Sequence, residues 1–151
     1  MTGSRKLSIL LLLAALLFPL GAEARAEVLC RVRVIHASDR GNHTDPALRD
    51  VSRNLTSVFR YTAYRLVNQR RMQLAYGRTG TMALPGGRRL QLTPMALSGR
   101  RIKFKIGIVK GGRAVFRTEV MLRDGGSVTI GGPPYKDGVL LFNIAGSSSR
   151  G

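Results

Sequence analysis

Cys30, His36 and His43 are the residues from which a nucleophilic enzyme would have to be assembled. A cysteine nucleophile needs a histidine within hydrogen-bonding distance to take the thiol proton. His36 lies on the same expected strand as Cys30, and at about 3.3 Å per residue the two are roughly 20 Å apart. His43 approaches Cys30 only if the intervening loop folds back. The spacing therefore argues against a Cys–His hydrolase.

The loop after this strand holds the residues with metal-ligand chemistry. His36, Asp39, His43 and Asp45 are close in sequence, and histidine and carboxylate groups suit zinc and related ions. Their spacing matches neither a zinc-ligand signature nor a calcium loop of alternating acids. Asp, Asn, Gly and Ser are also common in loops because they stabilise turns. We therefore predict no metal site.

The carboxylates and the Gly-Gly pairs form no catalytic or phosphate-binding motif. The acids after residue 26 fall mostly at expected turns or at a helix start, and no two of them stand out as an acid–base pair. The Gly-Gly pairs lie between expected strands, and neither G-x-x-x-x-G-K-[ST] nor a helix-opening G-x-G-x-x-G occurs. We predict no cofactor and no catalytic residue, and an unrecognised hydrolase remains an alternative.

The N-terminus is typical of an export signal. Arg5 and Lys6 precede an apolar run over residues 7–18, and Ala22-Glu23-Ala24 follows a Pro and a Gly. The run is too short to span a bilayer, which takes about 20 apolar residues. We predict a signal peptide over residues 1–26, cleaved after Ala24 or Ala26, and no transmembrane span afterwards. A lipoprotein reading would need Cys30, but the residue before it is a bulky Leu.

The remaining elements indicate one domain, expected over residues 27–145 with a flexible tail over 146–151. Alternating apolar and polar segments are separated by Pro85-Gly86-Gly87, Ser98-Gly99, Gly111-Gly112 and Asp124-Gly125-Gly126. Residues 131–134 read as a rigid loop, and residues 139–144 as the last strand. This pattern predicts a mainly β (α+β) fold: an antiparallel sandwich or open barrel with one N-terminal amphipathic helix.

The helix is expected over residues 46–60, with Asp45 as N-cap and Pro46 at its first position. The residues of its apolar face recur at helical spacing: Leu48, Val51, Leu55, Val58 and Phe59. Cys30, on the first strand (28–36), shares a face with valines and is expected to be buried, while Arg31 and Arg33 point the other way. A single cysteine excludes an intrachain disulfide.

The chain is strongly basic, with 25 Lys and Arg against 8 Asp and Glu. Removing residues 1–26 takes away three basic and one acidic side chain, which leaves 22 against 7 and a net charge of +15. Such a charge attracts polyanions. Outside the cytoplasm these are anionic lipids, lipopolysaccharide and acidic wall polymers, and no nucleic acid is expected. Heavy use of Arg, Gly and Ala is equally typical of a GC-rich genome, which explains the charge without a ligand.

Residues 101–108 show the cleanest alternation in the chain. Ile102, Phe104, Ile106 and Ile108 should face the core, which puts the intervening basic residues outside. If neighbouring strands pair as simple hairpins, basic residues from three strands share one surface. We call it the basic face and expect it to bind anions: Arg89, Arg101, Lys103, Lys105 and Arg117. A solvated edge whose charges discourage aggregation is the alternative.

From Val32 to Ile144 the chain resembles a group of small exported bacterial proteins with no assigned activity. The similarity lies in residues 55–66, in Leu84-Pro85-Gly86-Gly87-Arg88, and in residues 125–133 with Tyr135 and Gly138-Val139-Leu140-Leu141 after them. The resemblance implies no site residues. Together with the charge it favours an exported, non-enzymatic envelope module, periplasmic or extracellular, that binds or assists another envelope component. A direct binder of anionic glycan or lipid is the alternative, and the sequence leaves the oligomeric state open.

Overall fold

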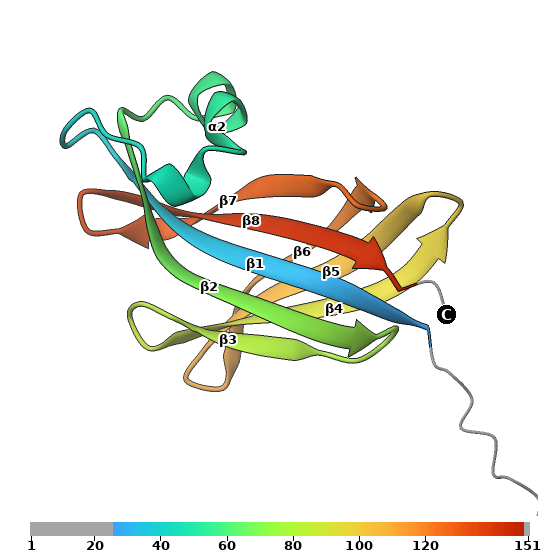
Figure 1. Ribbon diagram of the computed structural model, residues 1–151. Helices are drawn as coiled ribbons and strands as arrows, with labels where there is room; N and C mark the ends of the chain where they lie inside the picture. Colours follow the sequence, from blue (N-terminus) through green and yellow to red (C-terminus); the bar gives the residue numbers. More distant parts are fainter. Residues whose placement is uncertain (1–25, 150–151) are drawn as a thin grey trace, which may run out of the picture.

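Two four-stranded antiparallel sheets form the structure, a computed structural model that describes residues 26–149 (Figure 1). Sheet A has the strand order β2-β1-β8-β7, and sheet B has the order β3-β4-β5-β6. The strands are β1 Glu27–Ser38, β2 Ala63–Ala75, β3 Gly80–Leu84, β4 Arg88–Ser98, β5 Arg101–Lys110, β6 Arg113–Arg123, β7 Ser127–Tyr135 and β8 Gly138–Ser148. The prediction of a mainly β sandwich is confirmed. Residues 1–25 of the predicted signal peptide lie outside the described residues.

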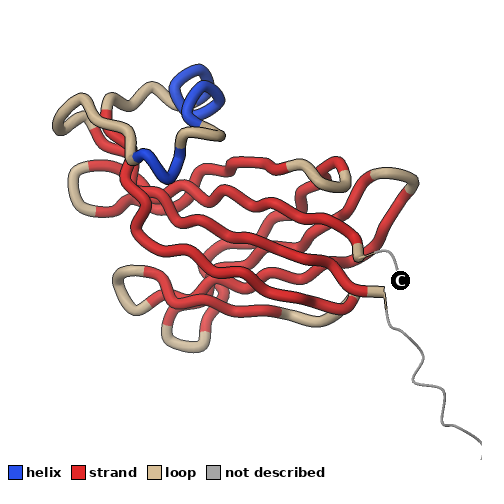
Figure 2. Tube along the Cα trace, in the orientation of Figure 1, coloured by secondary structure: helices blue, strands red, loops and turns tan. Residues whose placement is uncertain are grey.

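Within each sheet, strands that follow one another along the chain are paired neighbours, as the tube in Figure 2 helps to follow. The chain passes from sheet A to sheet B after β2 and returns after β6. β8 then pairs with β1, from Val28 opposite Ser148 to Ser38 opposite Gly138. The sandwich therefore has two open sides, one between β2 and β3 and the other between β6 and β7.

The main core fills the space between the sheets and follows the period of two along each strand. Ile102, Phe104 and Ile106 on β5 are fully buried, as predicted. Facing them from β1 and β8 are the other large members: Val28, Val32, Val34, Leu140, Phe142 and Ile144. Each buried side chain of this size contributes about 1.5–3 kcal/mol, so these residues hold the sheets together.

The predicted turn at Gly111-Gly112 joins β5 to β6. Both glycines have a positive φ, +57° and +74°. A two-residue hairpin turn of this kind needs positive φ at both positions, which residues with a Cβ adopt only at a cost. The turn therefore fixes the register that places β6 beside β5.

The insert, residues 39–62 between β1 and β2, covers one end of the outer side of sheet A (Figure 1). The single helix predicted over 46–60 is instead a 3-10 turn, η2 Pro46–Leu48, and a short helix, α2 Ser52–Val58. Asp45 is the N-cap, as predicted, and its Oδ1 accepts from Ala47 N at 2.9 Å. Val58 is 60% exposed, so the predicted apolar face does not extend to the end of the helix.

A second, smaller core lies beneath the insert. Leu48, Val51 and Leu55 pack on the outer side of sheet A. The sheet contributes Ile35, Ala37, Tyr64 and Leu141. Tyr64 also donates its hydroxyl to Phe59 O at 2.6 Å, which ties the end of α2 to the sheet.

Two segments near the C-terminus differ from the predicted pattern. Residues 131–134, expected to be a loop, belong to β7, where a register shift between Gly131 and Pro134 interrupts the pairing with β8. Proline is tolerated there because β7 is an edge strand. β8 extends to Ser148, so residues 146–148 of the expected tail belong to the sheet. Asp124 Oδ1 accepts from Ser148 N at 2.7 Å and holds this end.

Candidate functional site

The five residues of the basic face lie on the outer side of sheet B. On β5 the core residues alternate with Arg101 and Lys105, which are exposed, and with the half-buried Lys103. Arg89 on β4 and Arg117 on β6 are exposed on either side of β5. The structure therefore brings together all five residues, and the insert packs on the other sheet.

One carboxylate meets this group of cations. Glu119 is the only acid in strands β3 to β6, and its carboxylate forms an ion pair with Lys103 Nζ at 2.8 Å. The hydrogen bond and charge of Lys103, with a smaller effect of Lys105, lower the pKa of Glu119 below its ordinary value. Among the described residues, Arg89, Arg101, Lys105 and Arg117 form no ion pair. Most of the positive charge of the face is therefore available to an external anion.

Exposed apolar side chains accompany these cations. Met121 is opposite Lys103 on β6 and is 52% exposed. On the other side of Lys103, Met95 lies in the bulge of β4 and is 42% exposed. Leu97 is 46% exposed but pairs with Ile102, so it points to the inner side of the sheet. The outer side of sheet B thus combines positive charge with two exposed methionines.

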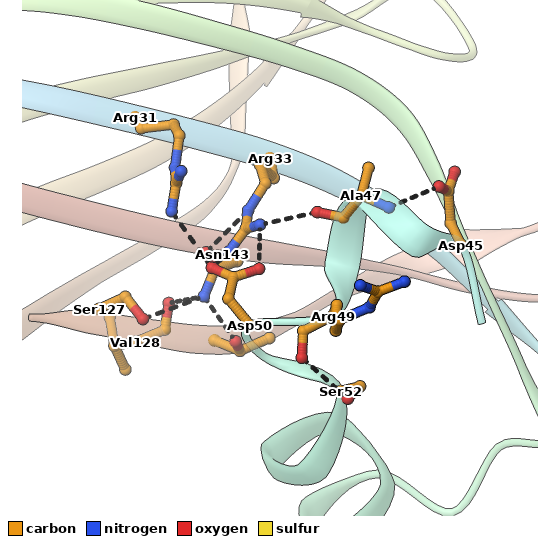
Figure 3. Close-up of polar contacts among 11 residues, drawn as sticks. Arg31, Arg33, Asp45, Ala47, Arg49, Asp50, Ser52, Ser127, Val128 and Asn143 are labelled. Carbon is orange, nitrogen blue, oxygen red and sulfur yellow. Dashed lines mark hydrogen bonds and ion pairs between the residues drawn. The ribbon is translucent and has the colours of Figure 1, made fainter.

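On the outer side of sheet A, by contrast, a cation of β1 is buried and hydrogen-bonded (Figure 3). Arg33 on β1 is 2% exposed, and its guanidinium donates to both carboxylate oxygens of Asp50, at 2.8 and 2.9 Å. It also donates to Asn143 Oδ1 on β8, at 3.2 and 2.9 Å, and to Ala47 O at 3.2 Å. We call Arg33, Asp50 and Asn143 the Arg33 network. It joins the insert to the centre of sheet A.

The Arg33 network explains why the predicted helix is interrupted. In a continuous α-helix the carbonyl of Ala47 would accept from the N–H of Val51. Here Ala47 O accepts from Arg33, and Val51 N donates to Leu48 O at 3.0 Å instead. The break turns Asp50 toward Arg33. The hydrogen bond from Arg33 lowers the pKa of Asp50, with the charges of Arg33 and Arg31 acting in the same direction against desolvation.

Cys30 lies on the inner side of β1, away from both outer faces. It is 3% exposed, and burial raises the pKa of its thiol to about 11. A thiol is a nucleophile only as its thiolate, so this cysteine is suited to packing. The expectation that Cys30 is buried is confirmed.

His36 belongs to a separate polar group at the other end of β1. Its Nε2 lies 3.2 Å from Asp137 Oδ1, but without the alignment of a hydrogen bond. Arg40 Nε binds the other oxygen of Asp137 at 3.0 Å, and the ring of Tyr135 packs edge-on against the imidazole at 5.1 Å. No nucleophile accompanies the histidine in these contacts.

The residues considered as metal ligands have other roles or lie apart. Asp45 caps η2 and also accepts from Leu66 N at 3.3 Å, while the backbone carbonyl of His43 accepts from Tyr64 N. Over residues 26–149, no three His, Cys, Asp or Glu side chains are placed to hold one ion.

Three hollows lie on the surface of the described residues. A groove of about 530 Å³ lies at the uncovered end of sheet A, near Leu29, Arg31 and Gln73. A crevice of about 380 Å³ opens on the β6–β7 side between Phe116 and Pro133, with Arg88 and Lys110 in its lining. Neither is lined by a histidine or a carboxylate. A third hollow, of about 390 Å³, has Asp124 and Arg123 in its lining, and there Asp124 accepts from Ser148 N.

The fold and these surfaces define a β-sandwich protein with one basic, uncovered sheet face. No family model, no curated protein and no solved structure matches the chain. Within residues 26–149, no helix is long and apolar enough to cross a membrane.

Sequence reasoning missed part of each outer face. Arg123, opposite Arg101, extends the basic face, and simple hairpin pairing would have included it. Met121 falls at an outward position between inward Val120 and Leu122, which would have revealed an exposed apolar residue. Nothing in the alternation of β1 indicated that Arg33 is buried, because its covering residue, Asp50, lies in the insert.

Proposed function

We propose that this protein is an exported, non-enzymatic module of the cell envelope that docks its basic face on an anionic lipid surface. The observation that carries the proposal is the contrast between the sheets: the insert covers part of sheet A, whereas the cations of sheet B remain exposed. The export signal expected over residues 1–26 and the absence of a catalytic motif support the same reading.

The geometry of the basic face suits a flat anionic partner. Arg101, Lys103 and Lys105 are spaced about 6–7 Å apart along β5, and Arg89 and Arg117 flank them on the adjacent strands. A lysine or arginine close to an anionic bilayer contributes about 1 kcal/mol to binding. Several such contacts on one flat surface therefore add up to stable attachment at low salt.

The exposed apolar residues favour a lipid over a purely hydrophilic glycan. Met95 and Met121, on the same side of the sheet as the cations, are 42% and 52% exposed. At the level of the headgroups, apolar side chains bury area against acyl chains while cations bind phosphates. An acidic wall polymer offers the charge without that apolar layer.

The test is flotation of the protein with vesicles containing about one-third phosphatidylglycerol, compared with uncharged vesicles. We expect salt-sensitive binding to the anionic vesicles only. The R101Q/K103Q/K105Q variant should lose about 3 kcal/mol, or roughly 100-fold in partition coefficient. Its thermal stability should be nearly unchanged, because exposed substitutions usually alter stability by less than about 0.5 kcal/mol.

A matched control distinguishes the effect of charges on the basic face from the effect of the protein's net charge. R53Q/R60Q/R65Q removes the same charge from exposed residues of the insert and β2, and we expect a loss below about threefold. Equal losses in both triple variants, or no binding by the parent at low salt, would refute the proposal. Binding of lipopolysaccharide or wall polymer alone would indicate the glycan alternative. Retention by envelope proteins without lipid would favour a module that assists another envelope protein.

A further inference from the structure

We propose that β6 is a self-pairing edge, through which two copies of this chain form a symmetric dimer. The four edge strands of the sandwich are β2, β3, β6 and β7. An exposed edge presents unpaired backbone groups, which proteins block by several devices. β7 and β3 have such devices and β2 carries arginines without an acid, whereas β6 has a bulge at Val115 and charges of both signs.

The devices on the other edges can be read from the contacts. β7 contains Pro133 and Pro134, which have no N–H to offer a further strand. β3 is five residues long, and its carbonyls at Thr81 and Ala83 accept from the side chains of Arg70 and Asn68. β2 has a register shift near Val67 and is rich in arginine.

β6 is open by comparison. Beyond its bulge at Val115, it runs regularly from Phe116 to Arg123 without proline. Among the described residues, the hydrogen bonds of positions 113–122 go only to β5. Two of its apolar side chains are exposed, Val115 in the bulge at 57% and Met121 at 52%. An open edge with exposed apolar residues favours addition of another strand.

The outward residues of β6 are complementary to themselves. In an antiparallel pair centred on Thr118, Arg117 lies opposite Glu119 of the second copy, and two-fold symmetry forms this pair twice. Val115 lies in the bulge, beyond the regular segment. On the inner side, Phe116 lies opposite Val120, and Thr118 lies opposite itself. Oppositely charged, aromatic–β-branched and Thr–Thr pairs are the cross-strand contacts that stabilise sheets.

The neighbouring registers do not have this property. A shift by two residues in one direction places Arg117 opposite itself, and the opposite shift places Glu119 opposite itself. Like charges directly opposite each other are destabilising. The sequence of β6 therefore selects one register. It also opposes indefinite growth, because a dimer closed by a two-fold axis uses both copies of this edge.

The positive charge of the chain acts against this pairing and sets its salt dependence. Arg113 and Arg123 stand at the two ends of β6, and the whole molecules carry a large positive charge, so two copies repel each other. Salt screens this long-range repulsion more than the close Arg117–Glu119 contacts. The dimer should therefore become tighter as salt is added, whereas binding to anionic vesicles should weaken.

Sedimentation velocity over a range of protein and salt concentrations, without lipid, tests the inference. R117E and E119R each place like charges opposite each other twice, and each should weaken dimerisation by about 10-fold to 100-fold. The R117E/E119R variant restores the opposite charges and should recover most of the affinity. Arg53→Glu makes the same charge change as R117E on exposed α2, far from β6, and should leave dimerisation unchanged.

A cross-linking experiment provides an independent measurement. Thr118→Cys places two thiols opposite each other only in the proposed register, so mild oxidation should give a disulfide-linked dimer. Thr81→Cys on β3 should not. A parent protein that is monomeric at all concentrations and salts would overturn the proposal. So would single charge variants that dimerise like the parent, or a double variant no better than the singles.

Discussion

β1 and β5 are both central strands with alternating basic and apolar residues, yet their outward cations have opposite environments. Arg33 on β1 is 2% exposed, whereas the side chain of Lys103 on β5 is 41% exposed. Residues 32–35 of β1 are all buried, while burial on β5 alternates. Alternation thus determines the side of the sheet to which a residue points, and a distant segment determines whether that side meets water.

The largest effect should come from removing the partner of the buried cation. Asp50→Ala leaves the guanidinium of Arg33 buried without its carboxylate. Breaking a fully buried pair costs about 3–5 kcal/mol. Because the side chain of Asp50 is 53% exposed, we expect a loss of about 2–3 kcal/mol in the free energy of unfolding, measured with urea.

Asp39→Ala is the matched control, since Asp39 is an exposed acid in the same insert. Its effect should be below about 0.5 kcal/mol. If Asp50→Ala were equally mild, Arg33 would not depend on the insert for its charge balance, and the contrast between β1 and β5 would lose its basis.

A smaller effect is expected on the inner side of β1. Cys30→Ser puts a hydroxyl into an apolar site, at a cost of about 1–3 kcal/mol. Because Cys30 is buried and its thiol pKa is raised to about 11, a thiol reagent should modify the native protein slowly and the unfolded protein fast. In a Leu29→Cys variant, the new thiol on the exposed outer side should react quickly. Rapid modification of Cys30 in the native state would contradict this assignment.

The smallest effects concern the two acids and their response to pH. The pKa of Asp50 is lowered in the folded state from 3.8, so its contribution is present above about pH 4 and is lost as pH falls through the folded-state value. The stability difference between the parent and Asp50→Asn should therefore shrink on acidification. It should persist in high salt, because the pair is partly buried.

Glu119 is the solvent-exposed counterpart, with its pKa lowered in the same direction by Lys103. The difference between the parent and Glu119→Gln should also decline below the ordinary carboxyl pKa, but salt should abolish it. If both acids responded to salt alike, the covered and uncovered faces would not differ electrostatically.

The sheets were predictable because local rules determine them. Periodicity of two gave the inward residues of β5, and glycine-rich turns marked the hairpins that place Arg89 and Arg117 beside it. The strand order within sheet B follows from such local connections. Anion binding by the basic face does not follow from the fold, so this role stays a prediction.

The features that the sequence did not reveal depend on contacts between distant segments. Arg33 meets Asn143 from 110 residues away, and its bond to Ala47 O divides the helix that the apolar spacing predicted. Residues 146–148 looked like a tail because they are small and polar, but pairing with β1 orders them in β8. The local propensity of a segment does not indicate which distant residues it will contact.

The pairing of β1 with β8 has a consequence for the order in which the sandwich forms. Every other strand pair in the two sheets joins elements adjacent along the chain, and such local contacts form quickly because they close short loops. β1 is synthesised first, yet one of its sides has no partner until the last strand is complete. We expect pulse-labelled hydrogen exchange to find the amides shared by β1 and β8 protected last. Until then the valine-rich first strand is the segment most exposed to wrong partners, and shielding it until β8 is complete would protect it.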